Sequence, residues 1–282
     1  MDQRIYRRRL ATNLVGLTLS TVSMALGLIG LLWILWTLFY NGLSAFTPAF
    51  FLNSTPAPGT EGGGLANAIV GSLMMVGFAT LVSTPIGILA GVFLAEFGQQ
   101  SRFASATRFV VDVMLSAPSI VIGLFVYAIA VATVKHFSGW AGSLALSLIA
   151  VPVVVRTTEN MLNLVPGSLR EAAFALGAPR WKVSLAVTLR AVRGGVITGV
   201  LLAIARMIGE TAPLLFTALN NQFFSLDMSQ PVANLPVVIY NFAMSPYPDW
   251  QRLAWGGAAL IALIVLSINI AARLLFRDKL QA

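Results

Sequence analysis

The feature that most constrains this chain is a series of apolar runs, each long enough to cross a lipid bilayer. A membrane-spanning helix needs about 20 mainly apolar residues. Only 10% of the residues are charged and 57% are hydrophobic, whereas about 25% are charged in a typical soluble domain. We therefore predict an all-α integral membrane protein. Its six transmembrane helices are expected at residues 14–40, 66–95, 107–134, 141–161, 194–218 and 253–276.

The first apolar run follows a basic segment, Met1–Leu10, and this combination resembles a signal peptide. The apolar region of a signal peptide is only about 7–15 residues long. Because this run extends from about Leu14 to Tyr40, we interpret it as a retained first helix.

Basic residues indicate the orientation of the spans, since Lys and Arg collect in cytoplasmic loops. If the amino terminus is cytoplasmic, the outward-facing segments contain only Lys135 and Arg252. The inward-facing segments then contain Arg4, Arg7, Arg8, Arg9, Arg102, Arg108, Arg156, Arg170, Arg180, Lys182, Arg190, Arg193, Arg273, Arg277 and Lys279. Both termini are therefore predicted to be cytoplasmic. The net charge of +8 reflects this topology rather than nucleic-acid binding, because the basic residues form no long tract.

This orientation divides the chain into segments with different surroundings. Two outer loops are rich in Gly, Pro and Asn, which favour irregular turns; they serve either as plain connections or as contacts for an extracytoplasmic partner. The segments are a cytoplasmic start (1–13), helix 1 (14–40), an outer loop (41–65), a region with helices 2–6 (66–276) that includes a cytoplasmic loop (162–193) and an outer loop (219–252), and a cytoplasmic tail (277–282).

Four successive spans each contain a proline: Pro85, Pro118, Pro152 and Pro213. Each proline lacks an N–H group and frees the carbonyl four residues earlier in a continuous helix. In lipid that carbonyl must find another partner or face protein or water. We interpret the four prolines as marks of a bundle that bends or moves.

The cytoplasmic loop at 162–193 contains its own helix signals. Ser168 stands three residues before Glu171, the spacing of a capping box. Gly177 is typical of a helix end and Pro179 cannot continue a helix, so we predict a short helix over roughly 169–176 and a second from Arg180. A helix of about two turns is unstable alone in water. It therefore either lies on the bilayer surface or docks on another protein, with Ala172, Ala173 and Ala175 allowing close approach and Phe174 and Leu176 as apolar anchors.

A charged pair lies inside the fifth predicted span. Arg206 is about 18 Å from the start of that span at about 1.5 Å per residue, near the centre of an apolar layer roughly 30 Å thick. An arginine there costs at least about 2.5–3.5 kcal/mol, so it should face the bundle interior, a partner or water. Glu210 is four residues further on and shares its helix face. The pair is either a structural bridge between helices or part of an anion pathway, in which the guanidinium would bind an oxyanion.

Further charges lie near the inner ends of the third and fourth spans. Arg156 and Glu159 have the spacing of an ion pair on one helix face, which we interpret as structural. Asp112 is expected to pair with a neighbouring arginine.

Several kinds of chemistry have no sequence support here. No G-x-x-x-x-G-K-[ST] phosphate-binding loop and no H-E-x-x-H motif occurs. The chain contains no cysteine and a single histidine, His136, so neither a thiolate site nor a histidine cluster is available. The energy for any transport must then come from a separate subunit or an ion gradient, and we predict a non-enzymatic chain with no cofactor or metal of its own.

The cytoplasmic loop resembles the EAA loop of ATP-binding cassette (ABC) importer permeases. The match covers Glu171, Ala172, Ala173 and Gly177, while Arg190 replaces a proline that often follows in this family. The resemblance implies that the segment containing Glu171, Ala172, Ala173, Phe174 and Gly177 is a coupling helix that docks on a cytoplasmic ATPase.

The stretch Ala205–Leu214 is similar to the phosphate-specific ABC importer permeases, as are Arg156–Glu159 and Val165–Ala173. The resemblance implies a type I importer permease fold in the bacterial inner membrane and inorganic phosphate as substrate. It places Arg206, Glu210 and Thr211 on the substrate pathway. It also implies a second homologous permease subunit, two ATPase subunits that bind ATP and Mg, and an extracytoplasmic phosphate-binding protein.

Three other functions remain open at this point. A permease for sulfate, molybdate or another oxyanion would use the same kind of charged pair. An ion-coupled secondary transporter would use Arg206 and Glu210 as a proton relay, although the internal repeats expected of many such transporters are not visible. A membrane scaffold would use the pair only as a structural bridge.

Overall fold

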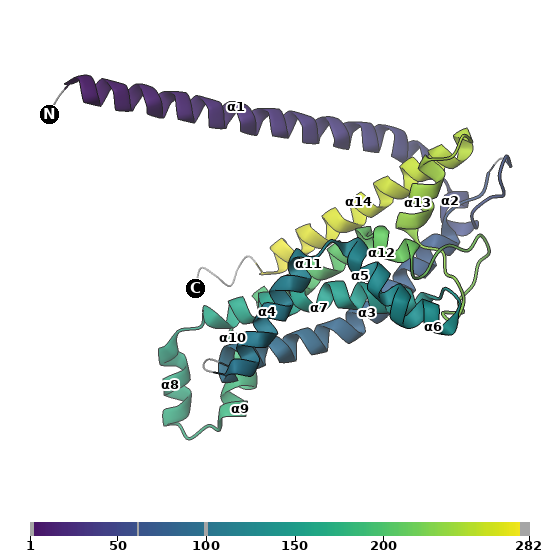
Figure 1. Ribbon diagram of the computed structural model, residues 1–282. Helices are drawn as coiled ribbons and strands as arrows, with labels where there is room; N and C mark the ends of the chain where they lie inside the picture. The colour runs from purple at the N-terminus through teal and green to yellow at the C-terminus, as the bar shows by residue number, and fades with distance from the viewer. Residues whose placement is uncertain (1–2, 61, 99–100, 277–282) are drawn as a thin grey trace.

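The computed structural model describes residues 3–60, 62–98 and 101–276, and this part of the chain contains helices and no strand (Figure 1). The long and medium helices are α1 (Gln3–Gly42), α3 (Ala66–Val92), α4 (Arg102–Ser116), α5 (Ser119–Val126), α7 (Gly139–Asn163), α8 (Gly167–Ala175), α11 (Arg193–Gly209), α13 (Leu235–Ala243) and α14 (Pro248–Phe276). Shorter pieces join them: η1 (Leu43–Ala45), α2 (Pro48–Leu52), η2 (Phe93–Phe97), η3 (Tyr127–Val131), α6 (Ala132–Val134), α9 (Arg180–Lys182), η4 (Val183–Thr188), α10 (Leu189–Ala191) and α12 (Ala212–Leu215). The predicted all-α class is confirmed; the predicted tail at 277–282 lies outside the described residues.

Within the described residues, four helices are long and apolar enough to cross a membrane, and two bent helix pairs could each form a further span. The first bent pair replaces the single third span predicted at 107–134. Its two parts, Arg102–Ser116 and Ser119–Val134, meet at 106°. Pro118 disfavours a helical conformation at the residue before it, and Ala117 is accordingly extended, with ψ at 136°.

The fifth predicted span also departs from a continuous helix. The helix α11 ends at Gly209, Glu210 is extended, and the short α12 begins at Ala212. Pro213 lies in the first turn of α12, where a missing N–H costs little. The prediction that Pro213 frees a carbonyl inside a continuous helix is therefore wrong, because the helix has already ended. Pro85 and Pro152, in contrast, lie inside the unbroken helices α3 and α7.

The core of the bundle is the pair α3 and α7, which pack along most of their lengths. Glycines make this approach possible. A Cβ atom on Gly87 would lie 2.6 Å from Val154 Cβ, and one on Gly91 would lie 2.6 Å from Thr158 Cβ. Small residues at such contacts let helices come close in membranes, where packing rather than water exclusion drives association.

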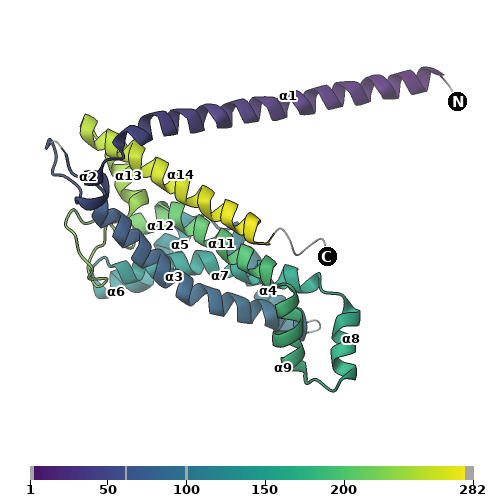
Figure 2. The same cartoon turned by 180° about the vertical axis from the view of Figure 1, so that it is seen from behind.

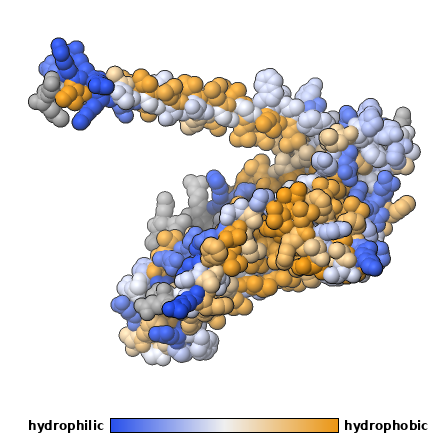
Figure 3. All heavy atoms as spheres, in the orientation of Figure 1, coloured by the Kyte–Doolittle hydropathy of each residue, from blue (hydrophilic) through white to orange (hydrophobic). Residues whose placement is uncertain are grey.

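The helix α1 extends away from the bundle and contacts it only near its carboxyl end (Figures 1 and 3). Gly42 is its single buried residue, and a Cβ atom there would lie 2.5 Å from Ala259 Cβ of α14. The helix is 40 residues long and mostly apolar along the rod seen in Figure 3, with a hydrophilic amino-terminal end. In a membrane, its exposed apolar side chains face either lipid or another protein.

Polar contacts hold together the two loops that were predicted to face outward, 41–65 and 219–252. Asn67, at the start of α3, is buried. Its amide donates to Thr55 Oγ1 at 3.1 Å and to the carbonyl oxygen of Asn221 at 2.9 Å. Asn234 caps α13 and also donates to the carbonyl oxygen of Leu219. The two outer loops are therefore joined to each other and to the bundle rather than extending freely into solvent.

Candidate functional site

The helix hairpin formed by α8 and α9 extends from one end of the bundle (Figure 2). The predicted helix near 169–176 is confirmed, but it begins earlier, at Gly167, with Pro166 as its N-cap and no side-chain capping bond. The predicted capping box is therefore wrong. Ser168 lies inside the first turn, where it no longer occupies the capping position.

The carboxyl end of α8 follows the prediction. Gly177 has a φ of +79°, a conformation that glycine adopts without steric cost. The N–H of Gly177 donates to the carbonyl oxygen of Phe174 at 2.9 Å, and that of Ala178 to the carbonyl oxygen of Ala173 at 3.2 Å. These two bonds form a Schellman motif, which ends the helix sharply before Pro179.

No residue of α8 is buried. Glu171 and Ala172 are exposed, Phe174 is 45% exposed and Leu176 is 88% exposed. The alanine and phenylalanine side chains singled out in the sequence thus lie on a free helix at the end of the molecule. This arrangement suits contact with another body more than packing within the chain.

One side chain ties α8 to the rest of the molecule. Arg170 forms an ion pair with Glu96 of η2, with Nη2 2.9 Å from Oε1. The same guanidinium donates to the carbonyl oxygens of Val165 at 2.7 Å and Leu162 at 2.8 Å. Only 9% of the Glu96 side chain is exposed, so this pair is well shielded from solvent.

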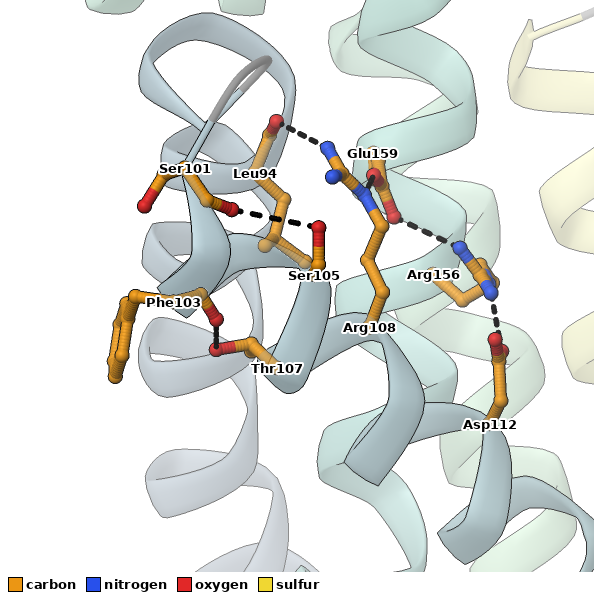
Figure 4. Close-up of polar contacts among 9 residues, drawn as sticks. All are labelled: Leu94, Ser101, Phe103, Ser105, Thr107, Arg108, Asp112, Arg156 and Glu159. Atoms are coloured by element: carbon orange, nitrogen blue, oxygen red, sulfur yellow. Dashed lines mark hydrogen bonds and ion pairs between the residues drawn. The ribbon is translucent and has the colours of Figure 1, made fainter.

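A second charged cluster joins α4 to α7 (Figure 4). Glu159, whose side chain is only 4% exposed, accepts from Arg108 Nε at 2.6 Å and from Arg156 Nη1 at 3.0 Å. Arg156 also pairs with Asp112, and Arg108 donates to the carbonyl oxygen of Leu94 at 2.8 Å. The predicted pairing of Arg156 with Glu159 and the predicted arginine partner for Asp112 are both confirmed.

The pair predicted in the fifth span is also formed. Arg206 Nε lies 3.2 Å from Glu210 Oε1, and the two side chains are 43% and 14% exposed in the chain alone. Glu210 follows the last residue of α11 and Thr211 follows Glu210, so the pair lies at the break between α11 and α12. Among the described residues, the bond from Arg206 Nε to Glu210 is the one side-chain hydrogen bond that this guanidinium makes.

The two groups of predicted site residues do not come together. Figures 1 and 2 both show α8 at one end of the bundle and α12 well inside it. Other helices, among them α4 and α5, lie between α8 and α12. Helix α4 meets α5, and α5 approaches α12 so closely that a Cβ atom on Gly123 would lie 2.5 Å from Pro213 Cα.

Sequence reasoning missed Glu96 and the roles of Arg108 and Arg170. A usable signal existed: Glu96 lies at the carboxyl end of a long apolar span, where the helix dipole disfavours a negative charge. A carboxylate in that position needs a cationic partner. Within the part of the chain that the structure describes, no group of three or more His, Asp or Glu side chains is arranged to hold a metal ion.

Together these features define a multi-pass helical membrane protein with a charged pair at a helix break and an exposed helix hairpin at one end. Residues 83–279 match the family described as "Binding-protein-dependent transport system inner membrane component". The chain belongs to this family.

Its relatives are similar over nearly the whole chain. It is 57% identical over 279 residues to the "Phosphate transport system permease protein PstA" of Pasteurella multocida, covering 99% of each chain. It is 56% identical over 267 residues to the protein of the same name from Yersinia pestis, covering 95% of this chain and 90% of that one.

Solved structures agree on the fold. The chain resembles the MetNI methionine ABC transporter in its inward-facing conformations, with a TM-score of 0.59 and 18% identity over 76% of this chain and 94% of that one. It also resembles a bacterial alginate ABC transporter in complex with a pentasaccharide-bound periplasmic protein, with a TM-score of 0.57 and 14% identity over 93% of this chain and 96% of that one. The predicted type I permease fold is confirmed by these likenesses.

Proposed function

We propose that this chain is the membrane-spanning permease subunit of an ABC importer for inorganic phosphate. One observation carries the choice of substrate: the chain matches a phosphate transport permease at 57% identity over 99% of both chains. This similarity favours phosphate over sulfate or molybdate and favours an ABC permease over an ion-coupled transporter or a scaffold. The subunit itself would catalyse no reaction.

The working assembly would contain a second, homologous permease subunit, two cytoplasmic ATPase subunits that bind ATP and Mg, and an extracytoplasmic phosphate-binding protein. The family description names a binding-protein-dependent system, and one structural neighbour was solved with its periplasmic binding protein. Both facts support an assembly of this kind.

In this proposal α8 is the coupling helix and docks on an ATPase subunit through Glu171, Ala172, Ala173 and Phe174, with Gly177 ending the helix. Its support is the exposure of α8, since none of its residues is buried and Glu171, Ala172 and Phe174 are exposed. Half-exposed Phe174 would provide an apolar anchor, because aromatic side chains are prominent in protein interfaces.

Arg206, Glu210 and Thr211 would line the phosphate pathway at the break between α11 and α12. A guanidinium can bind phosphate through two parallel hydrogen bonds, and Arg206 is only partly occupied by Glu210. Glu210 would balance the arginine when phosphate is absent and release it when phosphate arrives.

The proposed topology has six spans, each bent pair counting as one, with both termini in the cytoplasm of a bacterium and the bundle in its inner membrane. Residues 1–13 and 277–282 would be cytoplasmic, 14–40 the first span, and 66–276 the permease domain with its coupling loop at 162–193. The charge asymmetry of the loops supports this orientation.

Transport would follow alternating access. ATP binding closes the ATPase pair, α8 moves with it, and the bundle shifts toward an outward-open state that accepts phosphate from the binding protein. Such a shift requires that ATP and phosphate bind the two states with different affinities.

The test is uptake of labelled phosphate by proteoliposomes that contain the complete importer. We expect ATP-dependent uptake that excess sulfate does not inhibit and that deletion of Glu171–Gly177 abolishes. Uptake by this chain alone, driven by a proton gradient without ATP, would overturn the proposal. Normal coupled uptake after the deletion would overturn the docking role of α8.

A further inference from the structure

The π-helical turn η2, at the cytoplasmic end of α3, receives arginines from two other elements. Glu96 binds Arg170 of α8, and the carbonyl oxygen of Leu94 accepts from Arg108 of α4. A π turn departs from the regular helical hydrogen-bond pattern, and such turns occur frequently at functional sites. Here the turn makes one carbonyl and one carboxylate available to side chains from neighbouring helices.

The contact between Arg170 and Glu96 is a fork rather than a single bond. Arg170 Nε lies 3.2 Å and 3.3 Å from the two carboxylate oxygens of Glu96, while Nη2 lies 2.9 Å from Oε1. The remaining donors bind the carbonyl oxygen of Leu162 in the last turn of α7 and that of Val165, two residues beyond the end of α7. One guanidinium thus joins α8, α3 and α7.

The rest of α8 offers little alternative attachment. None of its residues is buried, and its main packing partner is η4, which belongs to the same cytoplasmic loop. A short turn precedes Gly167 and a glycine-containing turn follows Ala175. When α8 is displaced, these turns would bend and the bundle would stay in place, unless a side-chain contact transmitted the displacement to the bundle.

The bundle on the receiving side is connected onward. Arg108 holds both Leu94 of η2 and the buried carboxylate of Glu159 on α7. Its helix, α4, is the first half of a span bent by 106°, and the second half begins with α5, which abuts Pro213 beside the charged pair of α11. Displacement of η2 therefore reaches the helix break through contacts that are already made.

We propose that Glu96 is a positioning residue that transmits the motion of α8 to the bundle through Arg170. This inference rests on the proposed function, since it concerns how an ATPase docked on α8 drives the pathway. Glu96 would act through Arg170, with which it forms an ion pair, and not on a ligand. Its role is to make α8, α3 and α7 move as one body.

Breaking this link should uncouple the importer rather than dismantle it. The docking surface of α8 would remain, so the ATPase subunits would still bind and hydrolyse ATP. Fewer of their cycles would move the bundle. We expect Glu96→Gln and Arg170→Gln each to raise the ATP hydrolysed per phosphate transported by about tenfold, within the range typical of coupling between two sites.

The experiment measures this ratio in proteoliposomes with the complete importer and the binding protein, because the ratio is independent of how much complex folds. Lys182→Gln is the matched control: it removes one positive charge from the same loop, at an exposed position. Its ratio should equal that of the wild type. Arg170→Lys, which keeps the charge but loses the fork, should give an intermediate ratio.

The double variant Glu96→Gln/Arg170→Gln decides whether the two residues form one link. If they do, its ratio matches the single variants, because the second substitution removes nothing further. Unchanged ratios in the single variants, or multiplied effects in the double variant, would overturn the proposal. Loss of ATPase binding in the single variants would also overturn it, by assigning the pair to docking. Failure of the wild-type importer to take up phosphate would instead refute the proposed function.

Discussion

Arg206 and Glu210 lie four residues apart, and this spacing was sufficient to predict their ion pair. The position of the pair at a helix end was not predicted, because both residues were expected inside one continuous span at 194–218. The consequence for the arginine is considerable. At the break the side chain of Arg206 is 43% exposed, and this exposure supports the proposed role of the arginine in binding an anion.

We expect Arg206→Gln to reduce ATP-driven phosphate uptake by about 10- to 100-fold, because a charge-assisted hydrogen bond contributes about 1.5–3 kcal/mol. Arg206→Lys should retain part of the activity, since a single ammonium supplies charge without the planar fork. The measurement is initial uptake at equal amounts of membrane-inserted protein.

Arg193→Gln serves as the control for this experiment. Arg193 begins the same helix, at the opposite end from Arg206, and is exposed. Its substitution should leave uptake near the wild-type rate. Equal uptake by Arg206→Gln and Arg193→Gln would remove Arg206 from the phosphate pathway.

The buried acids show a different limit of sequence reasoning. Glu159 was paired correctly with Arg156 because the two share one helix. Arg108, its second partner, lies 51 residues away in sequence, and Glu96 lies 74 residues from Arg170. Local spacing carries no information about such pairs, which depend on how α3, α4, α7 and α8 meet in three dimensions.

At the scale of elements, α8 was predictable at one end and not at the other. Residue 177 has a positive φ, a conformation that favours glycine, so the residue type and the backbone conformation agree. At the amino end, the apparent capping signal at Ser168 competes with Pro166, whose fixed φ suits the start of a helix. The helix begins beside the proline.

Gly177→Ala should weaken binding of the ATPase subunits about fivefold. An L-residue with left-handed backbone costs about 1–2 kcal/mol, so the end of α8 would rearrange and its docking face would shift. The measurement is the affinity of purified ATPase subunits for the detergent-solubilised permease subunits.

Gly167→Ala is the matched control, because it adds the same methyl group at the other end of the same helix. A Cβ atom would meet nothing within 4 Å at either glycine, and only Gly177 has a positive φ. We expect Gly167→Ala to bind as the wild type does. If both variants bind equally well, the termination of α8 does not matter for docking.

At the scale of the whole molecule, the apolar runs predicted an all-helical chain with several membrane spans; within the described residues, four single helices and two bent helix pairs are long and apolar enough to be such spans. The arrangement of the helices in three dimensions was not predictable from these runs. The 106° bend between α4 and α5 and the 74° bend between α10 and α11 arise where local breaks combine with packing against other helices. The separation of α1 from the bundle left no sequence signal either, since its composition resembles that of the packed helices.

The proposed topology predicts which parts of the molecule a reagent outside the cell can reach. The chain has no cysteine, so single cysteines can be introduced without background. Leu176 and Phe223 are suitable sites because they are 88% and 79% exposed. In intact spheroplasts, a membrane-impermeant maleimide should label Phe223→Cys and not Leu176→Cys.

Permeabilising the spheroplasts of cells that lack the ATPase subunits provides the control, because Leu176→Cys should then also react. Labelling of Leu176→Cys before permeabilisation would reverse the proposed orientation. It would also place α8 on the wrong side of the membrane for an ATPase.

The packing of α1 against α14 has a consequence for the order of events during synthesis of the protein. Gly42 packs against Trp255 and Ala259, which emerge from the ribosome about 200 residues later, or roughly 10–40 s at common rates of synthesis. During that interval α1 is already complete, whereas α14, the long helix against which it packs in the described part of the chain, has not yet been synthesised. The first helix must therefore be surrounded by lipid or by insertion machinery until the last helix has been synthesised and can pack against it.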